Sequence, residues 1–149
     1  MHEGDSIQVA REAFGWSCGY VVSANGAGAE WIRSSEIAPV KADSDPPLRA
    51  WFGTWQGGED LVHIQASKTV GWLALDGTAA WDGLNGIQHF GNLEGEAKPT
   101  GNKLHYTRGQ GEWACAVDMT LLGDYILASD NDKCGGMNAR FGGVWRRKK

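Results

Sequence analysis

The C-terminal segment, residues 114–147 (ACAVDMTLLGDYILASDNDKCGGMNARFGGVWRR), decides the fold class of the chain. Cys115, Val117, Met119 and Leu121 alternate with smaller or polar residues, which is the period-two pattern of a strand with one buried face. Two turns, the second rich in glycine, divide the rest of the segment. We therefore predict three short strands joined by tight turns, at residues 115–121, 125–128 and 140–145.

The same segment holds two of the three cysteines of the chain. Cys115 and Cys134 would close a loop of about 20 residues, a constraint on the order of 3 kcal/mol in the chain-entropy account. We predict that they form a disulfide, which leaves Cys18 as a single thiol. The alternative is that all three are reduced and packed as small apolar side chains. A disulfide would favour an oxidising compartment.

Upstream of this segment, the pattern extends to eight strands within residues 49–149. The 22 glycines and 8 tryptophans of the chain favour short strands and tight turns over helices. The five further strands are predicted at residues 51–55, 60–65, 72–81, 87–96 and 103–107. The expected fold is all-β, with an eight-stranded antiparallel up-and-down barrel. The interior of such a barrel is filled by side chains or holds one small ligand.

Two short motifs of this region resemble known proteins. FGTWQG at residues 52–57 resembles the glycine-x-tryptophan start of lipocalin-like and avidin-like barrels, which implies a barrel of that kind. The C-terminal run resembles the end of small bacterial proteins of uncharacterised function, and this second resemblance names no activity.

The N-terminal residues form a separate module. GDSIQV, then GW with a following glycine, then WIRSSEIAPV resemble the middle strands, the binding tryptophan and the terminal 3₁₀ turn of SH3-like domains over residues 3–41. The resemblance places Trp16 at the ligand-stacking position, but Arg33 and Glu36 replace the groove proline and tyrosine of eukaryotic SH3 domains. The first strand of the family is missing, so an incomplete SH3-like barrel with an open edge is expected. The second domain or another subunit would cover that edge, the latter giving a homo-oligomer.

These patterns divide the chain into an SH3-like module (1–41), a linker (42–48) and a barrel (49–149). Pro46 and Pro47 stiffen the linker into an extended spacer.

The composition of the chain limits the classes of partner and the cellular compartments that we expect. A net charge of −4 argues against a nucleic-acid binder. No stretch approaches the roughly 20 apolar residues of a membrane helix, so no membrane span is expected. The first residues lack the apolar core of a secretion signal. We expect a soluble protein, periplasmic or secreted if a leader was removed and Cys115 is bridged to Cys134, and otherwise cytoplasmic.

The tryptophans of the barrel region supply the candidate ligand site. They either line an aromatic pocket or fill the interior with each indole N–H bonded internally, and the second interpretation is favoured. The six are Trp51, Trp55, Trp72, Trp81, Trp113 and Trp145. If a pocket exists, the predicted ligand-binding residues are Trp55, Trp72, Trp81, Tyr106, His63 and Arg140. Trp16 and Trp31 are the predicted partner-binding residues of the first module.

We assign structural roles to three other groups of polar residues: the histidines, one acid–base pair and one acidic run. His63, His89 and His105 show no chelating interval, so no metal site is expected. Asp118 and Arg140 are predicted to pair across neighbouring strands, with an orienting pair in a pocket as the functional alternative. The run Asp130-Asn131-Asp132 lacks the ligand spacing of a calcium loop and indicates an Asx turn.

Enzyme motifs such as G-x-S-x-G, H-E-x-x-H and the phosphate loop do not occur, so neither catalytic residues nor a cofactor is predicted. The leading hypothesis is a non-catalytic binding protein, with a small or extended ligand at the barrel mouth and the SH3-like module as docking element. The alternative is a structural or inhibitory protein-interaction scaffold with a filled barrel. An enzyme that uses His63 or His105 in a barrel cavity is the third hypothesis.

Overall fold

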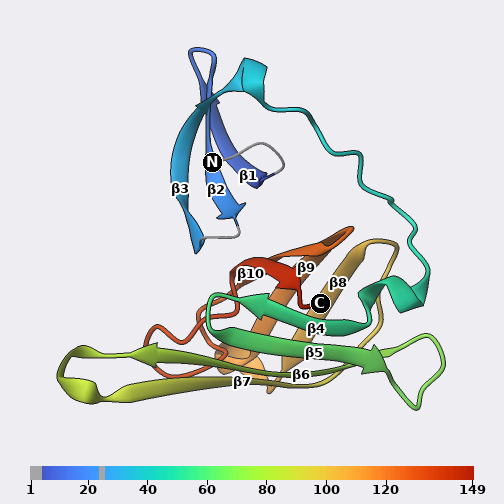
Figure 1. The fold of residues 1–149 in the computed structure, drawn as a ribbon. Coiled ribbons are helices and arrows are strands. Elements are labelled where there is room, and N and C mark those ends of the chain that lie inside the picture. Colours follow the sequence, from blue (N-terminus) through green and yellow to red (C-terminus); the bar gives the residue numbers. More distant parts are fainter. Residues whose placement is uncertain (1–4, 24–25) are drawn as a thin grey trace. The chain divides into compact units, whose positions relative to one another are not determined.

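The computed structural model describes residues 5–23 and 26–149, and it contains two compact units, Met1–Lys41 and Ala42–Lys149. Strands make up both units, and the only helices among the described residues are four short 3₁₀ turns (Figure 1). The all-β prediction is therefore confirmed. None of these helices is long and apolar enough to cross a membrane.

The first unit is a three-stranded antiparallel sheet. Its strands β1 (Ser6–Ala13), β2 (Trp16–Ser23) and β3 (Gly26–Arg33) pair in sequence order, and η1 (Ser34–Glu36) follows as the predicted 3₁₀ turn. The dipeptide Asn25-Gly26, a typical hairpin signal, lies partly outside the described residues.

Alternation along these strands gives the sheet two different faces. Ser17, Val21 and Ile32 are buried on one face. At Gly19, on the same face, a Cβ would lie 2.7 Å from Ile7 Cγ1, so glycine permits β1 to pack closely. The other face carries exposed aromatic rings. The apolar core that the described residues of this unit form is therefore small.

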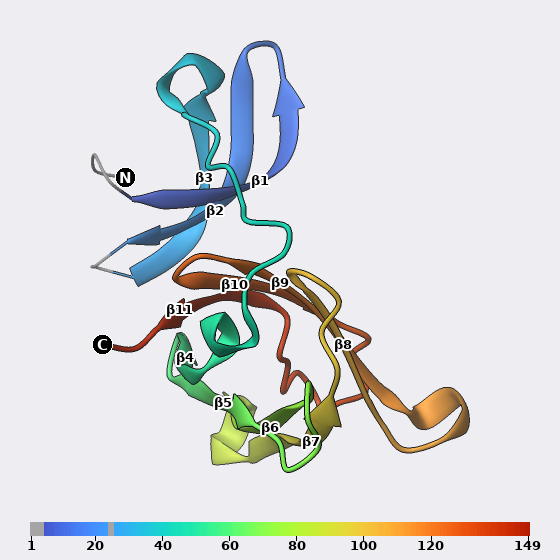
Figure 2. The same cartoon turned by 90° about the vertical axis from the view of Figure 1, so that its right-hand side faces the viewer.

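The second unit is an eight-stranded, nearly closed antiparallel barrel (Figure 2). Its sheet order is β7-β6-β5-β4-β11-β10-β9-β8. Neighbours in the sequence therefore pair, except β7 and β8, and the first strand, β4, pairs with the last, β11. The up-and-down prediction is confirmed. The strands are β4 (Gly53–Gly57), β5 (Asp60–Ala66), β6 (Leu73–Asp82), β7 (Gln88–Ala97), β8 (Lys103–Arg108), β9 (Cys115–Leu122), β10 (Tyr125–Asp130) and β11 (Gly143–Arg147). Three 3₁₀ turns complete the unit: η2 (Leu48–Trp51), η3 (Leu84–Gly86) and η4 (Gly111–Trp113).

Two strands begin two or three residues later than predicted. Trp51 belongs to η2, and β4 starts at Gly53. The last strand starts at Gly143, because the carboxylate of Asp130 accepts the backbone N–H groups of Phe141 and Gly142 and holds them out of the ladder. Arg140 consequently lies in a loop and not in a strand.

The seam between β7 and β8 is the only break in the ring of strand pairs among the described residues. The hydroxyl of Tyr106 bridges it, donating to Glu94 O at 2.8 Å and accepting from Glu94 N at 3.2 Å. The loop after β10 reinforces the other half of β7, since Gly135 pairs with Gly91 and Gly136 N donates to Phe90 O at 2.9 Å. Side-chain and loop contacts thus replace a ladder at this edge.

Large side chains fill the interior of the barrel. The prediction that tryptophans form the core is correct for three of the six: Trp51, Trp55 and Trp145 are buried. It is wrong for Trp113, which is 76% exposed because η4 holds it outside the strands. The buried cluster also contains Val62, Ile64, Leu73, Leu75, Leu93, Leu104, Tyr106, Val117, Met119, Leu121, Ile126 and Phe141.

The indole N–H groups of this core differ in their partners. Trp55 Nε1 donates to Trp51 O at 3.0 Å, and Trp145 Nε1 donates to Phe141 O at 2.9 Å. Trp51 Nε1 has no acceptor among the described residues, contrary to the prediction that each indole finds an internal partner.

Candidate functional site

Two of the predicted ligand-binding residues, Trp55 and Tyr106, belong to the packed interior of the barrel. The indole of Trp55 is fully buried, and the guanidinium of Arg147 lies 4.2 Å from its centroid. The Tyr106 ring is also buried, and its hydroxyl is engaged at the seam. Burial raises the pKa of Tyr106 above its ordinary value. Both residues hold the barrel together.

Trp72 directly precedes β6, and Trp81 lies near the other end of this strand. A strand advances about 3.3 Å per residue, so their backbones are about 30 Å apart. Trp72 is 36% exposed. Trp81 is half-buried and packs against His89, with 5.5 Å between the ring centroids. The two tryptophans cannot line the same small pocket.

His63, His105 and Arg140 each have a separate surface partner. His63 Nδ1 lies 3.1 Å from Thr54 Oγ1, on the outer side of β5, opposite in alternation to the buried Val62. His105 pairs with Asp118 at 2.6 Å, and Arg140 pairs with Asp132 at 3.0 Å.

The predicted Asp118–Arg140 pair is therefore wrong, because Arg140 stands in the loop and because His105 lies directly opposite Asp118 in the register. The six residues predicted to bind a ligand do not converge on one site. Among residues 5–23 and 26–149, no group of three His, Cys, Asp or Glu side chains is placed to hold a metal ion.

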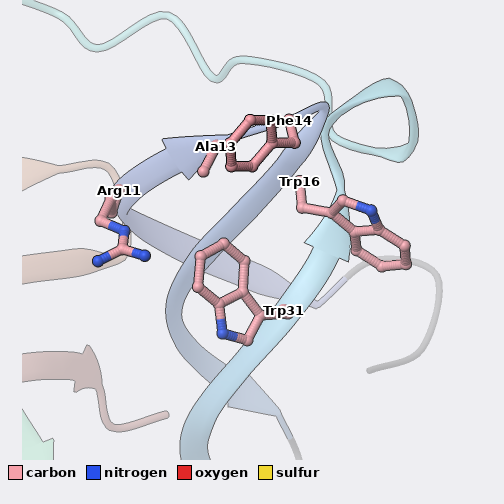
Figure 3. A pocket seen from close by; sticks show the side chains of 5 residues that line it. All are labelled: Arg11, Ala13, Phe14, Trp16 and Trp31. Atoms are coloured by element: carbon pink, nitrogen blue, oxygen red, sulfur yellow. The ribbon is translucent and has the colours of Figure 1, made fainter.

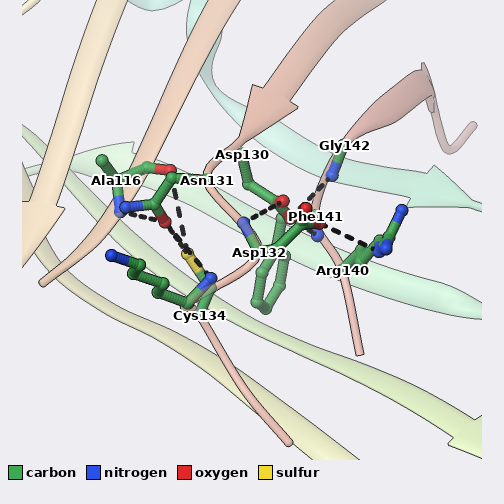
Figure 4. Close-up of polar contacts among 9 residues, drawn as sticks. Ala116, Asp130, Asn131, Asp132, Cys134, Arg140, Phe141 and Gly142 are labelled. Carbon is green, nitrogen blue, oxygen red and sulfur yellow. Dashed lines mark hydrogen bonds and ion pairs between the residues drawn. The ribbon is translucent and has the colours of Figure 1, made fainter. Parts of the chain in front are cut away.

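The acidic loop after β10 is built by side-chain bonds to the backbone (Figure 4). Asp130 Oδ1 accepts from Asp132 N at 3.0 Å, and Asn131 Oδ1 accepts from Lys133 N at 3.3 Å, so the predicted Asx turn is confirmed. Asn131 also bonds to Ala116 N at 3.1 Å across the loop. The predicted disulfide between Cys115 and Cys134 is present and ties the loop to β9.

An apolar groove of about 430 Å³ lies on the first unit (Figure 3). Its lining residues are Arg11, Ala13, Phe14, Trp16 and Trp31. Phe14 is fully exposed, while Trp16 and Trp31 are 42% and 48% exposed. The structure thus brings together the two residues predicted to bind a partner, Trp16 and Trp31, and adds Phe14 and Arg11 to them.

Phe14 reaches the groove through the turn that joins β1 and β2. Ala13 pairs with Trp16, so Phe14 and Gly15 are the two loop residues, with φ of 51° and 78°. Positive φ at both loop positions is the signature of a type I′ hairpin, which strongly prefers Asn-Gly. A phenylalanine in this left-handed region is unusual. Gly15 is the one local signal for this turn, and it does not predict that the Phe14 ring reaches the groove.

Two arginines lie over the rings of the groove face. The guanidinium carbon of Arg11 is 5.4 Å from the centroid of Trp31, and that of Arg33 is 5.6 Å from the centroid of Trp16. The strand register explains this arrangement: Arg33 lies directly opposite Trp16, and Arg11 and Trp31 both lie opposite Cys18. Cation–π contact holds each guanidinium beside an indole.

A second group of exposed apolar side chains lies at the tip of the β6–β7 hairpin. Leu84, Ile87 and Phe90 are all exposed there. The hairpin is drawn in yellow-green in Figure 1, with η3 at its end.

Comparison with known proteins finds no family model, no curated protein and no solved structure that matches this chain.

Proposed function

We propose that this protein is a non-catalytic protein-interaction module. In this proposal the filled barrel is a rigid scaffold, and the three-stranded unit docks a protein partner through the groove around Trp16 and Trp31. The observation that carries the proposal is the contrast between the two units: the barrel buries three of its indoles in the core, while the small sheet leaves Phe14, Trp16 and Trp31 at the surface.

Exposed aromatic rings favour a docking role on energetic grounds. Grouped apolar side chains on a surface mark interaction sites, and tryptophan and arginine are enriched among the residues that dominate binding energy. The groove combines two tryptophans, a phenylalanine and an arginine in one place. The resemblance to SH3-like domains, in which a tryptophan at the position of Trp16 stacks on the ligand, supports the same role. We regard the barrel as lipocalin-like or avidin-like in architecture only.

The filled interior favours a scaffold over a barrel that binds a ligand inside. Trp51, Trp55, Tyr106, Phe141 and Trp145 occupy the space that a ligand would need. A second candidate function, a small ligand at the barrel mouth, is supported by one observation. Trp51 Nε1 is a buried donor that a ligand acceptor could satisfy.

The docking function is tested by affinity capture with the full chain and two variants. Trp16→Ala with Trp31→Ala should abolish capture of a specific partner from the host. Trp113→Ala is the matched control, because it removes an exposed indole from the other unit. Like the groove tryptophans, Trp113 has a cation beside its ring, since Lys133 lies 5.6 Å from the centroid. Capture that is unaffected by the double variant, or that is lost equally in the control, contradicts the proposal.

The second candidate is tested separately by thermal shift with a panel of small molecules and glycans. A ligand that binds at the barrel mouth should raise the melting temperature of the full chain and quench tryptophan fluorescence. Such a response in the Trp16→Ala, Trp31→Ala variant would assign the ligand to the barrel. A flat response across the panel would eliminate this candidate.

A further inference from the structure

We propose that the groove face of the first unit recognises an extended peptide segment in which acidic side chains stand beside apolar ones. This inference rests on the docking function proposed above and names the chemistry of the partner. It follows from how the sheet sorts its charges between its two faces.

The groove face carries cations and aromatic rings. Residues directly opposite each other in an antiparallel pair project to the same side of the sheet. The pairs Arg33–Trp16 and Arg11–Cys18 therefore place both arginines on the side of Trp16, Cys18 and Trp31. The strand positions of this face contain no Asp or Glu in the sequence of β1 to β3.

The acidic residues of the strands project to the opposite face. Glu12 pairs with Ser17, and Glu30 pairs with Gly19, both of which are buried on the side away from Trp16. Glu12 Oε1 also accepts the hydroxyl of Ser17 at 3.1 Å. The strands of this unit therefore carry their arginines on the aromatic face and their glutamates on the opposite face. This charge sorting is complementary to an anionic partner.

The geometry of each arginine suits a carboxylate. A guanidinium that lies over an indole still presents its N–H edge, which can bind a carboxylate through two parallel hydrogen bonds. The neighbouring ring then packs against an apolar side chain of the same segment. Arg11 with Trp31 and Arg33 with Trp16 form two such adjacent ion-and-ring sites. The first site joins β1 to β3 and the second joins β3 to β2, and two such sites side by side fit a segment with repeated acidic and apolar residues.

The shape of the surface favours an extended segment over a compact molecule. Small-molecule sites usually bury most of the ligand in a deep cleft. Here the lining rings are themselves about half exposed or more, so the groove is shallow. The sheet order β1-β2-β3 also gives β1 and β3 one unpaired edge each within the described residues. A peptide that adds to such an edge would direct alternate side chains to the groove face.

The test is fluorescence polarisation of short labelled peptides with the full chain. The acidic probe alternates Glu with Phe and Pro, and its two companions carry Gln or Lys in place of Glu. We expect the acidic probe to bind about tenfold more tightly than the Gln probe, and its affinity to fall as salt is raised. Arg11→Glu and Arg33→Glu should each weaken it about tenfold. Arg108→Glu, an exposed charge reversal on the barrel, is the matched control and should leave it unchanged.

Each other outcome overturns the inference. Equal binding of all three peptides, sensitive to Trp16→Ala, would refute acidic recognition while the docking function stands. Preference for the Lys probe, or for labelled single-stranded DNA or a chito-oligosaccharide tested in parallel, would replace the acidic peptide by another partner class. Absence of binding of every probe, together with partner capture that survives the loss of Trp16 and Trp31, would refute both proposals. Circular dichroism of each variant confirms that the chain is folded.

Discussion

At the scale of single residues, Tyr106 shows how one polar atom completes the barrel. Its strand position was predictable, because Leu104 and Tyr106 alternate with polar residues. Its role was not predictable, since the sequence pattern indicates a ligand-binding residue. The partner of the hydroxyl is set by the stagger of β8 against β7, and no local pattern encodes that stagger. A bond to the backbone of Glu94 therefore had to be seen in the structure.

Tyr106→Phe should destabilise the barrel. The change removes the hydroxyl and leaves the N–H and C=O of Glu94 without this partner, so we expect a loss of about 1–2 kcal/mol in the free energy of unfolding. Urea denaturation followed by tryptophan fluorescence measures the loss, and amide exchange should quicken at Glu94. The control is Tyr125→Phe, which removes the hydroxyl of a half-buried tyrosine in β10. Equal effects of the two substitutions would show that the seam bond does not matter.

Tyr106 also gives stability a dependence on alkaline pH. Burial raises its pKa in the folded chain above the ordinary value of 10.0, so the folded state holds the phenolic proton more tightly than the unfolded state. This contribution is complete below pH 10.0 and is lost as pH rises through the folded pKa. The unfolding midpoint should therefore fall above that pH by more in the wild type than in Tyr106→Phe. Parallel curves for the two proteins would contradict this assignment.

At the scale of elements, alternation predicted the strands well and their ends poorly. The strands of the C-terminal segment and the inward side of β6 follow directly from the apolar period. Trp51 was misplaced in a strand because an apolar residue beside Phe52 fits a strand and a 3₁₀ turn equally. The start of β11 was missed because Asp130 captures two N–H groups from eleven and twelve residues away. Of the residues that line the groove, the sequence singles out Trp16 and Trp31 as partner-binding candidates, whereas Phe14 needed the turn geometry.

Removal of the disulfide should loosen one defined element. Cys115 and Cys134 are 19 residues apart, and the entropic constraint on such a loop is about 3 kcal/mol. Cys115→Ser with Cys134→Ser should lower the melting temperature and speed amide exchange at Gly136, whose N–H bonds to β7. Cys18→Ser, the control, removes a free thiol from the other unit and should leave both measurements unchanged. Unaltered protection at Gly136 in the double variant would show that the loop holds without its bridge.

Relief of the strained turn should stabilise the small sheet and weaken docking together. Phe14 has φ of 51°, where a bulky residue is disfavoured by about 1–2 kcal/mol. Phe14→Asn provides the Asn-Gly pair that this turn prefers. We expect slower amide exchange in β1 and β2 and weaker binding of the partner. A variant that gains stability and keeps full binding would show that the ring takes no part in docking.

At the scale of the whole molecule, the two units differ in how much core they contain. The large buried cluster lies entirely between Trp51 and Trp145, while the first unit buries few apolar side chains, chiefly Val21 and Ile32. Net stability grows with the apolar surface that a unit removes from water. Counted over the described residues, the barrel has the core of an independent domain, and the small sheet does not.

A chain of residues 42–149 should consequently fold by itself. Its urea midpoint, read from buried tryptophans, should match that of the barrel transition in the full chain. A chain of residues 1–41 alone should lack cooperative unfolding. A two-dimensional NMR spectrum of the shorter chain gives an independent check, in which poorly dispersed amide signals would refute independent folding of the barrel.

The pairing of β4 with β11 has a consequence for engineering. Trp55 lies opposite Arg147, and a Cβ at Gly53 would lie 3.2 Å from Arg147 Nη1. The first and last strands of the barrel therefore place its two ends close together. Neighbouring termini tolerate circular permutation and insertion into host loops. If these two ends are joined and new termini are made at Gly86, in the exposed tip after β6, the permuted protein should keep the same eight paired strands.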